Sequence, residues 1–280
     1  MNPGEFNLLK AKRRTLNGYY LIDSEDVEVL LPNKYVPTGM KPDDEISVFI
    51  FKDSEDRITA TTITPRILLN EFAVLEVVDV NPVGAFLDWG LEKDLLVPYS
   101  EQAEKMKVGY SYPVYLYLDD KTQRLVATAK INKILERDDI TVKAGEEVEL
   151  LICNSTDLGI NVIINNLHLG LLYDNELFQA VLPGDVVTGY IKNVRPDNKI
   201  DVSLQKQGYV SVEPNSKKIL QKLKDNSGFL NVTDKSDPVI ILAKLEMSKK
   251  IFKKAIGSLY KQRLISIKED GIYLVDETGK

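Results

Sequence analysis

The sequence contains very few of the residues on which most catalytic and metal sites depend. Its 280 residues include one cysteine, one histidine and one tryptophan. A single cysteine, Cys153, cannot form an internal disulfide, which suits a reducing compartment and predicts a cytoplasmic protein. One cysteine and one histidine are too few for a zinc cluster, so we expect no metal site. We also expect His168 to have a structural role.

Signatures of membranes, cofactors and catalysis are missing as well. No apolar run approaches the roughly 18 residues of a membrane span, and residues 1–6 do not begin a signal peptide. We therefore expect no membrane association. The chain has no phosphate-binding glycine loop before a lysine, no nucleophile elbow and no dinucleotide fingerprint. The sequence thus predicts a non-enzymatic protein without a cofactor and without catalytic residues.

The chain does contain a repeat with a period near 70 residues. Each copy has one strand that starts at a glycine and a closing strand that starts at a basic residue: Gly18 and Arg57, Gly84 and Arg124, Gly159 and Lys199. The second copy follows the first by 66 and 67 residues at these two landmarks, and the third follows the second by 75 at both. Such agreement indicates three related structural units.

Each unit has the pattern of five short strands. In the second unit Val114, Leu116 and Leu118 alternate with Tyr115 and Tyr117, as on a half-buried strand. A short turn or helical segment at 99–104 separates the third strand from the fourth. Five strands with this insertion in under 80 residues suit the OB-fold, whose second and third strands bind oligonucleotides or oligosaccharides. We predict a mainly β protein with three OB-fold barrels at 1–66, 67–140 and 141–208, and a separate module at 209–280.

The second unit resembles the S1 domain, an RNA-binding OB-fold. The resemblance rests on Gly-Ala-Phe-Leu-Asp at 84–88, Leu-Val-Pro at 96–98, Gly109 and Arg-Leu-Val-Ala at 124–127. In that family an aromatic on the glycine-led strand stacks on bases, and a later strand offers a second ring. The resemblance implies four RNA-binding candidates in the barrels: Tyr20, Phe86, Arg124 and Tyr173.

The three units also depart from the S1 pattern. The aromatic that usually precedes the glycine is replaced by Asn17, Val83 and Leu158. The ring two positions after the glycine is kept in the first two units but becomes Asn161 in the third. We therefore expect a thinned RNA surface, with the third barrel serving mainly as a spacer. Trp89, three positions after the Phe86 ring, is expected in the core.

After residue 208 the periodicity becomes helical. A helix is predicted at 216–224, and Asp237 followed by Pro238 predicts the start of a second helix that runs to about 244. Ser248 can cap a third helix that runs to about 262. Strands at 265–267 and 272–275 flank an Asp-Gly pair, the favoured two-residue hairpin turn. Three helices and a hairpin predict an α+β winged helix-turn-helix.

The third predicted helix carries a basic face. Its apolar stripe is predicted to contain Ile251, Ala255, Ile256 and Leu259. On the opposite side lie four lysines that we predict to contact RNA: Lys250, Lys253, Lys254 and Lys261. From 248 to 264 there are six cationic residues and no acid, and residues 207–280 carry a net charge of +5 against −11 for residues 1–206. Such a basic module indicates a polyanionic partner.

Residues 247–265, together with Asp-Lys-Ser-Asp-Pro at 234–238, resemble the same region of the bacterial conserved virulence factor B family. This resemblance implies tandem S1 domains followed by a winged helix, RNA binding and regulation of bacterial gene expression, and it implies no catalytic activity.

Two other functions remain open. The chain could be a DNA-binding transcription factor that uses the winged helix, but no dimerisation helix for paired half-sites is visible. Its acidic barrels also argue against coating duplex DNA, because phosphate contacts need cations. Alternatively, it could be a protein-interaction scaffold associated with the ribosome. An enzyme is the least favoured reading.

Overall fold

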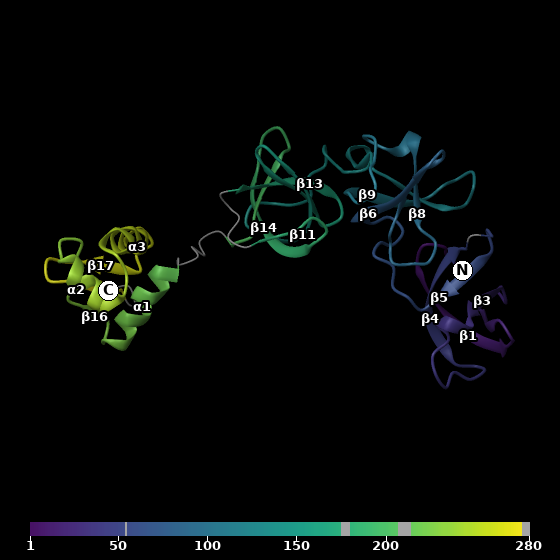
Figure 1. The fold of residues 1–280 in the computed structure, drawn as a ribbon, viewed down its shortest axis with the longest axis horizontal. Coiled ribbons are helices and arrows are strands. Elements are labelled where there is room, and N and C mark those ends of the chain that lie inside the picture. The colour runs from purple at the N-terminus through teal and green to yellow at the C-terminus, as the bar shows by residue number, and fades with distance from the viewer. Residues whose placement is uncertain (54, 175–179, 207–213, 276–280) are drawn as a thin grey trace. The chain divides into compact units, whose positions relative to one another are not determined.

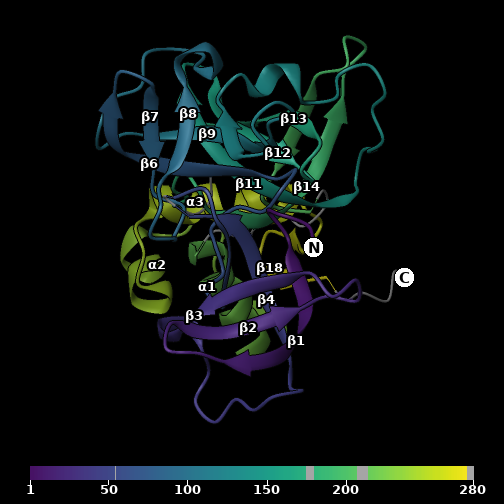
Figure 2. The same ribbon diagram turned by 90° about the vertical axis from the view of Figure 1, so that its right-hand side faces the viewer.

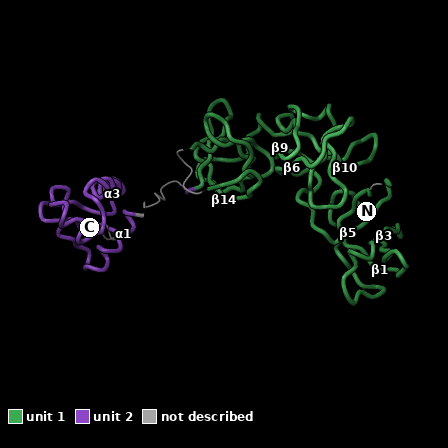
Figure 3. Tube along the Cα trace, in the orientation of Figure 1, with its two compact units in different colours: residues 1–204 green, residues 205–280 purple. Residues whose placement is uncertain are grey.

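The computed structural model describes residues 1–53, 55–174, 180–206 and 214–275. The chain divides into two compact units, Met1–Leu204 and Gln205–Lys280 (Figure 3). The first unit holds the three repeats and the second holds the C-terminal module.

The first repeat forms a closed barrel with the strand order β1-β2-β3-β5-β4. Its elements are β1 (Phe6–Arg14), β2 (Gly18–Ile22), β3 (Glu28–Pro32), the 3-10 helix η1 (Asn33–Tyr35), β4 (Glu45–Lys52) and β5 (Ile58–Thr61). β4 is buried on both faces: Val48 and Ile50 lie in the core of this barrel, whereas Phe49 and Phe51 pack in a cluster with the second barrel.

The other two repeats arrange their five strands in the corresponding order, and Figure 1 shows where they follow the first along the chain. The second comprises β6 (Phe72–Asn81), β7 (Gly84–Leu87), β8 (Leu95–Pro98), η2 (Tyr99–Glu101), β9 (Ser111–Leu118) and β10 (Leu125–Thr128). After η3 (Ile131–Lys133), the third comprises β11 (Glu147–Thr156), β12 (Gly159–Ile164), β13 (His168–Tyr173), β14 (Val186–Val194) and β15 (Ile200–Ser203). The third barrel is closed, whereas the second is a five-stranded sheet in the order β10-β9-β6-β7-β8. The predicted mainly β fold with three five-stranded units is confirmed.

The glycines of the repeat have a steric explanation. At each of them, a Cβ atom would collide with a backbone carbonyl oxygen of the next strand: Leu31 for Gly18, Val97 for Gly84 and Leu172 for Gly159. Only a residue without a side chain lets the two strands approach this closely.

The first two barrels share a hydrophobic core. Phe49 and Phe51 of β4 are buried in the same cluster as the core of the second barrel. Trp89 packs edge to face against both rings, with its ring centroid 5.8 Å from that of Phe49 and 6.5 Å from that of Phe51. The predicted core position of Trp89 is therefore confirmed, with much of its packing against the neighbouring barrel.

A polar and apolar contact joins the second barrel to the third. β6 and β9 lie beside β11 (Figure 2). The Asn166 side chain accepts from the Phe72 backbone N–H and donates to the Asn70 carbonyl, each at 2.9 Å. His168 is fully buried nearby: one ring nitrogen lies 2.8 Å from the Thr141 hydroxyl and the other 3.1 Å from a backbone carbonyl. These bonds support the predicted structural role of this histidine.

The second unit is a winged helix. It consists of α1 (Pro214–Asp225), β16 (Phe229–Leu230), α2 (Pro238–Leu245), α3 (Lys249–Lys261), β17 (Ile265–Ile267) and β18 (Ile272–Leu274). Both predicted caps form: the Asp237 carboxylate accepts from the Val239 N–H at 2.8 Å, and the Ser248 hydroxyl accepts from the Ile251 N–H at 3.3 Å.

Three details of the second unit differ from the sequence prediction. β16 was not expected; it is two residues long and pairs with β18. The hairpin loop spans four residues, because Ile267 pairs with Ile272. In the apolar stripe of α3, the buried residue is Phe252, whereas Ile251 is exposed. Phe252 packs in the core formed by the three helices, and Ile251, the residue before it, therefore faces solvent.

Candidate nucleic-acid interface

Phe86 and Arg124 come together at a cleft between the first and second barrels. Phe86 lies on β7 with its ring half-buried, while its neighbours Ala85 and Leu87 are fully buried. Arg124 immediately precedes β10 and is exposed. The cleft measures about 720 Å³. The structure thus places two of the predicted site residues at one surface.

The cleft carries balanced charge. Its basic lining residues are Lys34, Arg57, Lys93 and Arg124, and its acidic ones are Asp53, Asp56, Glu92 and Asp94. Asp56 of the first barrel forms an ion pair with Arg124 of the second. Such a surface suits an uncharged aromatic ring, such as a base, better than a free phosphate.

Lys93 holds the two barrels together inside this cleft. Its ammonium group donates to the backbone carbonyls of Lys52 at 3.2 Å and Asp53 at 2.6 Å. Burial lowers the pKa of Lys93 from its usual value. The Lys93 ammonium group therefore stabilises the contact between the two barrels.

Tyr20 belongs to a different surface of the first barrel. The Arg13 guanidinium lies 4.0 Å from the centroid of its ring, and Arg13 is also 2.9 Å from the Glu28 carboxylate. Tyr20 does not line the cleft that holds Phe86. The two rings predicted to stack on bases therefore occupy separate surfaces.

Tyr173 forms part of a second cleft, of about 640 Å³, on the third barrel. Arg195 donates to the Tyr173 hydroxyl and forms two hydrogen bonds with Asp201, at 2.7 and 2.9 Å. The sequence analysis did not identify Arg195. This residue follows the end of β14, and it contacts Tyr173 only because the strands close into a barrel. The third barrel therefore has its own cleft, and Asn161 is one of the residues that line it.

The four predicted lysines of α3 are all exposed: Lys250, Lys253, Lys254 and Lys261. They lie opposite the buried side of the helix, where Phe252, Ala255 and Leu259 pack. The carboxylate of Asp234 is 4.0 Å from the Lys253 ammonium. We call these four residues the lysine face.

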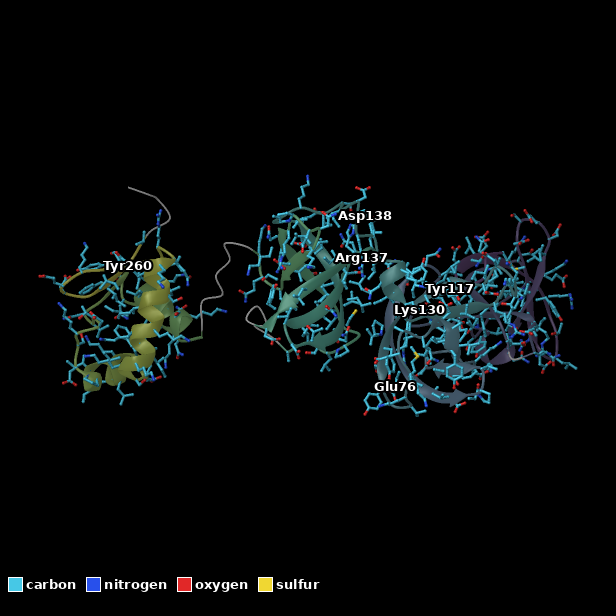
Figure 4. The ribbon with its side chains drawn as sticks, turned by 90° about the horizontal axis from the view of Figure 1, so that it is seen from above. Glu76, Tyr117, Lys130, Arg137, Asp138 and Tyr260 are labelled. Carbon is cyan, nitrogen blue, oxygen red and sulfur yellow. The ribbon has the colours of Figure 1, made fainter. Side chains whose placement is uncertain are left out.

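Two other residues of α3 accompany the lysine face. Gly257 lies among these lysines, and a Cβ atom there would meet no atom within 4 Å. Tyr260, marked in Figure 4, is 57% exposed on the same helix. It was missed as a candidate, although its position three residues after Gly257 is the signal that could have found it.

Comparison with known proteins gives the family. Residues 3–63 and 71–130 match the S1 domain, and residues 217–274 match the CvfB-like winged helix domain. The chain is 32% identical to the uncharacterized protein YitL of Bacillus subtilis, over 93% of this chain and 90% of that protein. The chain belongs to the conserved virulence factor B family. It is 26% identical to conserved virulence factor B of Staphylococcus aureus strain USA300, over 86% of this chain and 82% of the relative.

A solved structure from Streptococcus pneumoniae is also similar. It is described as a multidomain protein with nucleic acid binding domains, and the match covers 98% of both chains at 21% identity with a TM-score of 0.46. The match to YitL confirms the family membership expected from residues 234–238 and 247–265, and the match to the CvfB-like winged helix domain confirms the winged helix.

The described residues offer neither a metal-binding cluster nor a membrane-spanning helix. Within the described ranges, no group of three or more histidine, cysteine, aspartate or glutamate side chains could hold a metal ion. In the same part of the chain, no helix is long and apolar enough to cross a membrane.

Proposed function

We propose that the chain is a non-catalytic RNA-binding protein whose winged helix attaches to phosphates and whose barrels hold unstacked bases. The observation that carries this proposal is the lysine face: four exposed cations on one side of α3, in a stretch from 248 to 264 without an acidic residue. Phosphate contacts by lysine supply most of the sequence-independent affinity for a nucleic acid.

The charge distribution assigns different tasks to the two units. Residues 1–206 carry a net charge of −11, so the barrels repel a polyanion on average. Their clefts instead present rings, Phe86 in one and Tyr173 in the other. Base–aromatic stacking is worth about 1–3 kcal/mol per base and needs no excess positive charge. We infer that α3 provides attachment and that the barrels provide any base preference.

Single-stranded RNA fits this arrangement better than duplex DNA. A half-buried ring such as Phe86 can stack only on a base that has left its helix, and exposed bases of this kind are common in RNA loops and single strands. S1 membership of two barrels supports the same partner. We further propose that the protein acts in the bacterial cytoplasm as a post-transcriptional regulator, with the ribosome as a second candidate partner.

A filter-binding comparison tests the proposal with the full-length chain. Single-stranded RNA, duplex RNA and duplex DNA of equal length are titrated at two salt concentrations. We expect the tightest binding to single-stranded RNA and weaker binding of all three at higher salt. Preference for duplex DNA would favour the transcription-factor alternative. Absence of binding to any of the three would favour a protein-interaction scaffold.

A further inference from the structure

Helix α2 presents an apolar face to solvent. Its buried side is formed by Ile241 and Leu245, which pack in the core of the winged helix. On the other sides, Val239 is 73% exposed, Leu242 58% and Ile240 45%. Ala243, one turn after Val239, is exposed as well. These four exposed residues, 239, 240, 242 and 243, are called the α2 face below.

The α2 face is unusual for a helix at the surface of a domain. A surface helix normally places polar residues opposite its buried stripe. The only charged residue among Pro238–Leu245 is Lys244. A helix that is apolar on all sides is expected to be covered on all sides, so its exposed part marks an interaction site.

The size of the face favours a short partner segment. From their exposed fractions, its side chains present on the order of 300 Å² of apolar surface, a size often associated with function. A stable protein–protein interface buries about 800 Å² on each partner. The α2 face can therefore be the centre of a small interface, but it is too small to form a stable dimer interface alone.

The charges around the face favour an acidic partner. Of the six lysines in residues 234–254, three lie outside the lysine face: Lys235, Lys244 and Lys249. The same stretch contains three acids. The three acids are already engaged: Asp234 lies near Lys253, Asp237 caps α2, and Glu246 pairs with Lys218. A second copy of this domain would bring like charges together, which disfavours association. An acidic segment would meet complementary charge.

We propose that the α2 face docks an amphipathic, acidic segment of a partner protein. The apolar side chains of the segment cover Val239, Ile240 and Leu242, and its carboxylates face Lys235, Lys244 and Lys249. This contact is separate from RNA binding, since its apolar residues lie on α2 and the lysine face lies on α3. The chain then links an RNA to a protein.

A defined peptide tests this proposal. The probe is a fluorescein-labelled helical peptide with leucine at positions i, i+3, i+4 and i+7 and with Asp and Glu elsewhere. Its binding to the full-length chain is followed by fluorescence polarisation. We expect micromolar binding to the wild type and at least tenfold weaker binding to the Val239→Gln/Leu242→Gln double variant. RNA affinity of the same variant is expected to be unchanged, which keeps this test independent of the proposed function.

Two controls sharpen the result. Leu182→Gln removes a leucine of the first unit that is 68% exposed, against 58% for Leu242, and is expected to leave peptide binding unchanged. A peptide with lysine in place of every acid is expected to bind at least tenfold more weakly than the acidic peptide. Should the double variant melt at a lower temperature, the single Leu242→Gln variant provides the comparison.

Three outcomes would overturn the proposal. The first is a wild type that does not bind the acidic peptide. The second is equal binding of the acidic and basic peptides. The third is a dimer in analytical ultracentrifugation that the double variant abolishes, because a second copy would then be the occupant of the α2 face.

Discussion

The carboxylate of Asp56 in the first barrel is paired with the guanidinium of Arg124 in the second, across the cleft onto which Phe86 opens. Arg124 is the cation that a phosphate would contact if its base stacked on Phe86. Asp56 already neutralises this cation. For an RNA phosphate to contact Arg124, it would have to displace the Asp56 carboxylate from the guanidinium. The pair is half-exposed, so its contribution to stability is small.

The Asp56→Asn variant is therefore expected to bind single-stranded RNA more tightly. An exposed ion pair is worth about 0–1 kcal/mol, which limits the gain to roughly fivefold and the loss of stability to the same free energy. Asparagine suits the backbone here, because residue 56 has a φ of 61°. Titration of the variant against the wild type measures the effect. An equal gain from Glu55→Gln, a neighbouring exposed acid, would show that only net charge matters.

Phe86 and Trp89 are expected to respond to truncation in opposite ways. Phe86→Ala should weaken RNA binding by about 1–3 kcal/mol while the melting temperature changes little. Trp89→Ala should lower the free energy of unfolding by about 3–5 kcal/mol, because this ring is buried between two barrels. Binding titrations and thermal melts of both variants check the pair. Loss of stability without loss of affinity in Phe86→Ala would assign that ring to barrel packing.

The lysine face is expected to control the salt dependence of binding. Replacing Lys250, Lys254 and Lys261 with glutamine should lower the slope of log affinity against log salt by roughly 0.7 for each lost phosphate contact to single-stranded RNA. All RNA sequences should be affected alike, since phosphate contacts carry no sequence information. The matched control replaces three lysines of α1 with glutamine: Lys217, Lys222 and Lys224. Equal slopes for the two triple variants would exclude a specific role for α3.

Gly257→Ala separates helix stability from contact with RNA. A glycine in mid-helix costs about 1 kcal/mol relative to alanine, and a methyl group here meets no neighbour within 4 Å. The variant should therefore melt a few degrees higher. If an RNA backbone approaches α3 closely at this position, the same methyl group should weaken binding. A more stable variant with wild-type affinity would show that the RNA lies elsewhere.

Cys153 is expected to be inert in the folded protein. Burial raises the pKa of its thiol to about 12, so almost no thiolate is present at pH 8. It lies in the apolar contact between the second and third barrels. Labelling by a thiol reagent should therefore be slow under native conditions and should rise with denaturant as this contact opens. Rapid labelling of the native chain would contradict this packing.

Much of the fold could be predicted because local chemistry and tertiary structure agree. The three glycine-led strands appear where predicted, since a close carbonyl requires glycine at each. The caps Asp237 and Ser248 mark the starts of α2 and α3 because each side chain satisfies a free N–H group. The lysine face followed from helical spacing alone.

The remaining features depend on contacts between residues distant in sequence. Ile251 and Phe252 are both apolar, and only the packing of three helices decides which is buried. Asp56 and Arg124 are 68 residues apart, so their cleft is invisible before two barrels meet. The same holds for Arg195 with Tyr173. The sequence could thus predict which residues line the candidate surfaces, but not which acidic residues pair with their cations.

The shared aromatic cluster of Phe49, Phe51 and Trp89 also determines how the chain loses its structure. A cut between the first two barrels would leave three large rings in water, so neither piece should persist alone. These barrels are expected to melt together as one cooperative unit. In calorimetry, the 70-residue repeat would therefore not appear as three equal transitions, and a truncation that keeps the first two barrels together should preserve this cluster.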